Sequence, residues 1–161
     1  MNLYLLRHAD AEEAARSGKD ADRALSGKGR EVMEVVAAAF AKVGKAQAIW
    51  HSPLRRAKET AEFVAARFPK AVLTSTAALA PSADPRKILL ELSRDRWDDV
   101  VLVGHMPHLG LLLGLAVTGQ EEVDVPMKKA AVARVSFPGS HPSPPGELKW
   151  VLSPSLAQRI R

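Results

Sequence analysis

Two apolar runs that end in basic or small residues constrain the fold of this chain more than any other feature. Residues 3–6 are Leu-Tyr-Leu-Leu and lead directly into Arg7 and His8, while residues 100–103 are Val-Val-Leu-Val and lead through Gly104 into His105. Short apolar runs of this kind are typical of buried strands. Because open α/β sheets bind ligands beyond the carboxyl ends of their strands, we expect both histidines at a binding edge.

Turn and cap residues between these runs predict strands that alternate with helices. We expect strands at residues 2–7, 46–50, 71–73 and 100–103. We expect helices over residues 31–43 and after each of Pro53, Pro85 and Pro107, with Ser52 as the N-cap of the second. Elements in this order form right-handed crossovers, so we predict an α/β fold with a mainly parallel sheet.

The end of the chain has a different pattern. Residues 131–137 alternate in size and polarity, residues 138–146 are rich in Pro, Gly and Ser, and residues 148–152 are extended. This pattern predicts a C-terminal β-hairpin, antiparallel at or near an edge of the sheet. We assign no element to residues 153–161.

Composition narrows the class of protein. The 161 residues are 47% hydrophobic and 25% charged, which predicts a single domain over residues 1–161. The chain has no cysteine and no visible signal peptide, so we expect a cytoplasmic protein. The apolar stretch 109–117 is far shorter than the roughly 20 residues of a membrane span. We expect a monomer with no membrane partner.

The net charge favours an anionic partner. The formal charge is +5, but the chain has no basic run, and its aromatic residues are not interleaved with Lys or Arg. Recognition of nucleic acid uses such arrangements, so we expect no nucleic-acid partner. A phosphorylated protein or small molecule fits the charge better.

Basic residues at the expected binding edge point to phosphate chemistry. Arginine offers a planar fork that matches phosphate oxygens, so Arg7 and either Arg55 or Arg56 can hold a phosphoryl group while a histidine attacks in line. Neighbouring guanidinium groups would lower the pKa of His8 and keep its attacking nitrogen unprotonated. His105 would then stabilise the developing negative charge.

Four ordered segments resemble the signature of the histidine phosphatase superfamily, and most of all its SixA-like phosphohistidine phosphatase branch. Residues 6–11, which contain Arg7 and His8, resemble the Arg-His-Gly motif with Ala9 in place of glycine, and residues 22–26 resemble the Asp-Arg-Pro-Leu-Thr segment. Residues 52–60 resemble Ser-Pro-x-x-Arg-Ala-x-x-Thr, and residues 103–107 resemble Gly/Ser-His-x-Pro. The resemblance implies a phosphoglycerate mutase-like three-layer sandwich, with helices on both faces of the sheet.

Carried over to this chain, the resemblance implies a metal-independent phosphatase that uses no cofactor. It implies that His8 is the nucleophile and forms a phosphohistidine, that Arg7 and Arg56 bind phosphate, and that His105 is the second pocket histidine. Ser52 is a further phosphate-binding candidate through its hydroxyl. The expected substrate is a phosphorylated histidine-containing protein domain, or alternatively a small phosphorylated molecule. Outside the enzymes, the alternative is a non-catalytic phosphate-binding or phosphoprotein-binding module.

The sequence does not assign a general acid. Larger relatives supply a glutamate from an inserted segment, whereas residues 79–88 offer only Asp84. Asp10, beside the proposed nucleophile, is the other candidate for an acid or accessory group. An imidazole leaving group needs an acid less, because the P–N bond is labile. This favours phosphohistidine over phosphate esters as the substrate.

Three further basic residues lie close to these motifs: His108, Arg55 and His51. His105 and His108 are three residues apart, but no third metal ligand is evident, so we expect no metal. We interpret Arg55 as a solvated helix residue and His51 as a structural one.

Overall fold

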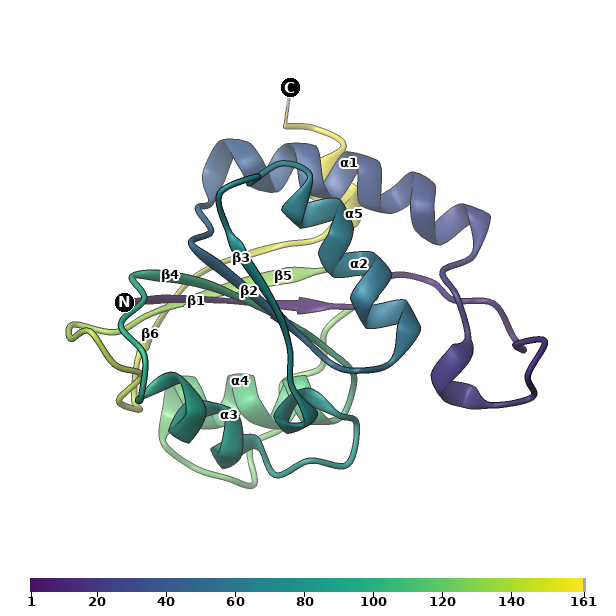
Figure 1. The fold of residues 1–161 in the computed structure, drawn as a ribbon. Coiled ribbons are helices and arrows are strands. Elements are labelled where there is room, and N and C mark those ends of the chain that lie inside the picture. The colour runs from purple at the N-terminus through teal and green to yellow at the C-terminus, as the bar shows by residue number, and fades with distance from the viewer. Residues whose placement is uncertain (161) are drawn as a thin grey trace.

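The structure, a computed structural model that describes residues 1–160, is built on one sheet (Figure 1). Its strands follow the spatial order β3-β2-β4-β1-β5-β6. The first four in chain order, β1, β2, β3 and β4, pair in parallel, and β5 and β6 pair antiparallel. The bounds are β1 (Asn2–Arg7), β2 (Ala48–His51), β3 (Val72–Ser75), β4 (Asp99–Gly104), β5 (Val132–Ser136) and β6 (Glu147–Leu152). The predicted mainly parallel sheet and the C-terminal hairpin are both confirmed.

Helices cover both faces of this sheet, as predicted. Figure 1 shows α1, α2 and α5 on one face and α3 and α4 on the other. The bounds are α1 (Gly27–Val43), α2 (Arg55–Ala65), α3 (Pro85–Leu92), α4 (His108–Thr118) and α5 (Pro154–Ala157), with 3-10 turns at η1 (Asp20–Asp22) and η2 (Ala77–Leu79). Within residues 1–160, no helix has both the length and the apolarity needed to cross a membrane.

The central strand β1 shows why helices cover both faces of the sheet. Its side chains alternate between two separate apolar cores, because successive residues of a strand point to opposite faces. Leu3 and Leu5 belong to the core under α3 and α4, whereas Tyr4 and Leu6 belong to the core under α1 and α2. All four side chains are buried, and the strand therefore reads as a continuous apolar run.

The starts of two helices differ from the predictions, each for a local reason, and one short helix was not predicted. Helix α1 begins at Gly27 instead of residue 31, because the Ser26 hydroxyl accepts a hydrogen bond from the Gly29 amide at 3.0 Å and caps the first turn. Helix α2 begins at Arg55 instead of Pro53, because the Ser52 amide still donates to the Val103 carbonyl of β4 at 3.0 Å. The C-terminal tail contains the short helix α5.

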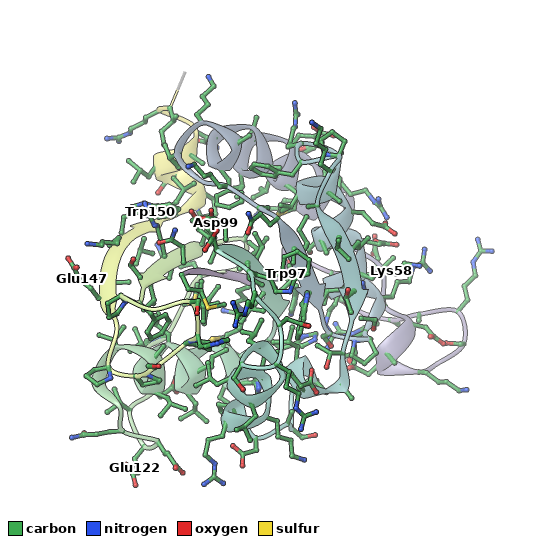
Figure 2. All side chains as sticks on the ribbon, turned by 60° about the vertical axis from the view of Figure 1, so that its left-hand side comes forward. Lys58, Trp97, Asp99, Glu122, Glu147 and Trp150 are labelled. Atoms are coloured by element: carbon green, nitrogen blue, oxygen red, sulfur yellow. The ribbon has the colours of Figure 1, made fainter. Side chains whose placement is uncertain are left out.

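A buried polar cluster closes the amino ends of β1 and β4. The Asp99 carboxylate, labelled in Figure 2, accepts hydrogen bonds from Asn2 Nδ2 at 2.8 Å and from the Tyr4 hydroxyl at 3.1 Å. Burial and the Asp99 charge raise the pKa of Tyr4 to about 12, so the phenol stays a donor. The cluster is satisfied within the protein, which is typical of a structural network.

Candidate active site

The carboxyl ends of β1 and β4 open into a cavity of about 210 Å³. It is lined by Arg7, His8, Ala11, Arg23, Arg56, Pro81, His105, Met106 and Lys129. The structure thus brings together the two histidines and the two arginines that the resemblance marks as nucleophile, second histidine and phosphate ligands. Because β1 and β4 are adjacent and parallel, with Arg7 paired to Gly104, the residues that follow them emerge side by side.

His8 is held as a neutral ring with one free nitrogen. Its Nδ1 lies 2.7 Å from the Ala9 carbonyl oxygen. A carbonyl can only accept, so Nδ1 carries the proton and Nε2 keeps an unprotonated lone pair. Burial lowers the pKa of His8 to about 4, the Ala9 hydrogen bond opposes this, and the charges of Arg56 and Arg7 lower it further. The arginines act in the predicted direction, but burial is the larger cause.

His105 faces His8, with 4.9 Å between the ring centroids. Its Nε2 lies 2.8 Å from the hydroxyl of Ser52, a fully buried residue that also accepts the Leu54 amide at 3.3 Å. Burial, followed by the proximity of His8, lowers the pKa of His105 to about 3, so the ring is neutral near pH 7. Ser52 does not line the cavity, and it therefore positions His105 instead of touching the space where phosphate would sit.

The two arginines are anchored and still have unused donors. Arg56 Nη1 and Nη2 donate to the backbone oxygen and the carboxylate of Asp20, at 3.0 and 3.1 Å, and Arg7 Nη1 donates to the Met127 carbonyl at 2.6 Å. In the described part of the chain, Arg7 Nε, Arg56 Nε and His105 Nδ1 are buried without a hydrogen-bond partner. Buried donors are nearly always paired, so unpaired ones around a cavity suit an oxyanion guest.

The carboxyl groups near the site are ionised and not poised to give up a proton. Hydrogen bonds from Lys129 and Ser26 lower the pKa of Asp10. Burial raises the pKa of Asp20, but its hydrogen bond with Arg56 and that side chain's charge outweigh this and lower it. Asp84 caps α3 and pairs with Arg86, which lowers its pKa to about 2, and it does not line the cavity.

The other basic residues that the sequence singled out lie outside the cavity. Arg55 is exposed and pairs with Glu59 one helical turn later, at 2.8 Å. His51 is buried, and its Nδ1 donates to the Ser52 carbonyl at 2.8 Å. His108 is buried at the start of α4, where burial lowers its pKa. No group of three or more His, Asp or Glu side chains among residues 1–160 is arranged to hold a metal ion.

Sequence reasoning missed two cationic residues of the cavity. Arg23 lies in the segment that resembles Asp-Arg-Pro-Leu-Thr, and its Nη1 donates to the Glu12 carbonyl at 3.0 Å. Its position in that motif could have identified Arg23 as a candidate residue of the site. Lys129 enters the cavity from the segment before β5, and its ammonium contacts Asp10 at 2.7 Å. No pattern in the sequence relates Lys129 to a residue 119 positions earlier.

Comparisons with known proteins agree with this geometry. The sequence model of the histidine phosphatase superfamily (branch 1) matches residues 3–80. An uncharacterized protein of Picosynechococcus sp. is 34% identical over 138 residues, covering 82% of each chain. The structure of the protein histidine phosphatase SixA complexed with tungstate has a TM-score of 0.81 at 22% identity and covers 96% of this chain and 98% of that one. A mycobacterial glucosyl-3-phosphoglycerate phosphatase has a TM-score of 0.68 at 20% identity, with coverages of 92% and 97%.

The similarity to SixA confirms the expected phosphoglycerate mutase-like α/β fold. The matched segment includes Arg7, His8 and Arg56, the residues that meet in the cavity. The uncharacterized protein of Picosynechococcus is similar to this chain over 82% of both. The chain belongs to the histidine phosphatase superfamily.

Proposed function

We propose that this protein is a metal-independent phosphatase that removes phosphate from protein-bound phosphohistidine through a covalent intermediate on His8. The observation that carries the proposal is the state of the His8 ring: its Nδ1 proton is held by the Ala9 carbonyl, and Nε2 is left free beside two arginines. A neutral imidazole with a fixed tautomer is a competent nucleophile without a separate base.

The first step forms one bond and breaks another. His8 Nε2 attacks phosphorus while the bond to the leaving nitrogen breaks, and the phosphoryl group moves to His8. Arg7 and Arg56 neutralise the charge on the phosphoryl oxygens, and His105 donates a hydrogen bond as a neutral group. Water then attacks phosphorus, the His8–phosphorus bond breaks, and inorganic phosphate leaves.

The carboxyl groups near the cavity indicate which leaving group the site can release. No Asp or Glu among the described residues lines the cavity, and Asp10, Asp20 and Asp84 all have lowered pKa values. An alkoxide leaving from a phosphate ester needs a proton donor, whereas an imidazole nitrogen can take its proton from solvent. This supports a phosphoramidate substrate over an ester.

The similarity of fold to a glucosyl-3-phosphoglycerate phosphatase keeps a small-molecule phosphomonoesterase as the second candidate. The two functions differ in the substrate that is turned over, although both pass through phosphorylated His8. A non-catalytic phosphate-binding module differs from both, because it would form no phosphoenzyme.

The test compares wild type with His8→Ala, and with His141→Ala as a matched histidine control in the loop before β6. Each protein is incubated with a phosphorylated histidine-containing domain and with sugar and nucleotide phosphates, with and without EDTA. We expect rapid release of phosphate from the protein substrate, an acid-labile phosphoenzyme, and no effect of EDTA. His8→Ala should lose both signals and His141→Ala should keep them. Turnover of esters alone would select the phosphomonoesterase, and the absence of any phosphoenzyme would select the binding module.

A further inference from the structure

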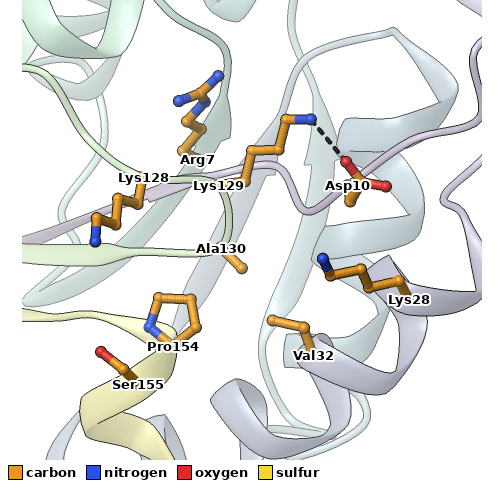
Figure 3. Close-up of a pocket in the computed structure, with 9 residues that line it drawn as sticks. All are labelled: Arg7, Asp10, Lys28, Val32, Lys128, Lys129, Ala130, Pro154 and Ser155. Carbon is orange, nitrogen blue, oxygen red and sulfur yellow. Dashed lines mark hydrogen bonds and ion pairs between the residues drawn. The ribbon is translucent and has the colours of Figure 1, made fainter.

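A second cavity adjoins the catalytic one and shares two of its cationic residues. It has a volume of about 530 Å³, and we call it the basic groove. It is lined by Arg7, Asp10, Lys28, Val32, Lys128, Lys129, Ala130, Pro154 and Ser155 (Figure 3). Arg7 and Lys129 line both cavities, so the two spaces meet at these side chains.

The groove carries an excess of positive charge. Asp10 is its one acidic residue, and both oxygens of that carboxylate are occupied: Oδ1 by the Lys129 ammonium and Oδ2 by the Ser26 hydroxyl, each at 2.7 Å. Lys28 and Lys128 are exposed and make no ion pair within residues 1–160. Two cations at the groove are therefore free to meet an incoming anion.

The shape of the groove separates these free cations across an apolar surface. Figure 3 shows Lys28 and Lys128 on opposite sides, with Val32 and Pro154 below them. Ala130 contributes a further buried apolar side chain. An apolar floor with basic sides matches a peptide segment that has both apolar and acidic side chains. A small, fully hydrophilic phosphate compound would leave that floor uncovered.

We propose that the basic groove binds an acidic segment of the protein that carries the phosphohistidine, with carboxylates of that segment meeting Lys28 and Lys128. The proposal rests on the proposed function, and it adds the surface that recognises the protein partner. Because Arg7 and Lys129 line both cavities, a phosphohistidine in the catalytic cavity places the residues next to it over the groove.

The test uses the double variant Lys28→Gln/Lys128→Gln, which removes two charges without touching the catalytic cavity. The matched control is Lys42→Gln/Lys70→Gln, which removes two exposed lysines that line neither cavity. Lys42 lies on the same helix as Lys28, about 21 Å further along it. The substrates are a phosphorylated histidine-containing domain with carboxylates flanking its histidine, and phosphoimidazole, a small phosphoramidate without a carboxylate.

We expect kcat/KM of the groove variant for the protein substrate to fall about tenfold, mainly through KM, and to depend less on salt than in wild type. Its kcat/KM for phosphoimidazole should stay within about twofold of wild type, because that substrate does not reach the groove. The control variant should match wild type on both substrates. A charge-reversed pair, Lys28→Glu/Lys128→Glu with a substrate whose flanking acids are replaced by lysine, should recover activity.

Two results would overturn the inference while leaving the proposed function intact: an unchanged kcat/KM for the protein substrate, or an equal loss on both substrates. A larger loss on small sugar phosphates would instead assign the groove to a small anion and would also overturn it. If wild type hydrolyses neither phosphoramidate and forms no phosphorylated His8, the proposed function itself is wrong.

Discussion

The two ends of the same pair of strands bury polar groups in different ways. At the amino ends of β1 and β4, the Asp99 carboxylate is matched by Asn2 and Tyr4. At the carboxyl ends, Arg7, Arg56 and His105 each keep a buried nitrogen without a partner in the described chain. Burial of charge is common to both ends. The groups around Asp99 satisfy one another, whereas the unmet donors of Arg7, Arg56 and His105 belong to residues that line a cavity. Variants at the two ends should therefore separate stability from turnover.

The largest effect is expected from Arg56→Lys at the binding end. Lysine keeps the charge but loses the planar fork that matches two oxygens. We expect kcat/KM for the phosphohistidine substrate to fall about 100-fold, or about 2.7 kcal/mol of transition-state stabilisation. Steady-state kinetics measure this. Exposed Arg55→Lys is the control and should stay near wild type, and similar losses in both variants would contradict a specific role for Arg56.

Asp99→Ala at the structural end should show the reverse. The substitution leaves the buried Tyr4 hydroxyl and the part-buried Asn2 amide without their acceptor, which costs about 2 kcal/mol of unfolding free energy. Urea unfolding measures this loss, and kcat/KM of the folded variant should be unchanged. Asp98→Ala, at the exposed neighbouring residue, is the control. A stable Asp99→Ala protein with impaired turnover would break the comparison between the two ends.

The smallest effect concerns how much stability acid removes from wild type compared with His105→Gln. The pKa of His105 is lowered from its usual value near 6.5 to about 3, so the unfolded chain binds a proton that the folded protein does not. The stability that depends on the neutral ring is complete above pH 6.5 and is lost as the pH falls toward 3. Between pH 8 and pH 5, wild type should therefore lose about 1–2 kcal/mol more unfolding free energy than His105→Gln. If wild type and His105→Gln lose equal unfolding free energy between pH 8 and pH 5, measured by urea unfolding, the pKa of His105 is not lowered in the folded protein.

The sequence predicts best the parts of the molecule that local patterns and sheet topology determine together. The apolar runs of β1 and β4 end in His8 and His105, and parallel strands bring those ends to one edge. For β1 and β4, periodicity and connection rules are enough. The start of α2 offers both Arg55 and Arg56, and it is the resemblance to Ser-Pro-x-x-Arg that selects Arg56.

The rest depends on contacts between distant segments, which no local pattern encodes. Lys129 reaches the site because β5 pairs with β1 and brings the preceding loop against Asp10. Ser52 supports His105 because its backbone remains in the sheet ladder. Asp84 is used as the cap of α3 and pairs with Arg86, so an acid that looked available in sequence is already occupied.

The close approach of α1 to the loop that carries Asp10 limits which sequences can keep this site. A Cβ atom at Gly29 would lie 2.1 Å from the Asp10 carbonyl oxygen, closer than any real contact, whereas a Cβ atom at Gly27 would meet nothing within 4 Å. A side chain at position 29 would push away the loop that holds Lys129 between the two cavities. A library built to retune this enzyme can therefore vary position 27 but has to keep glycine at position 29.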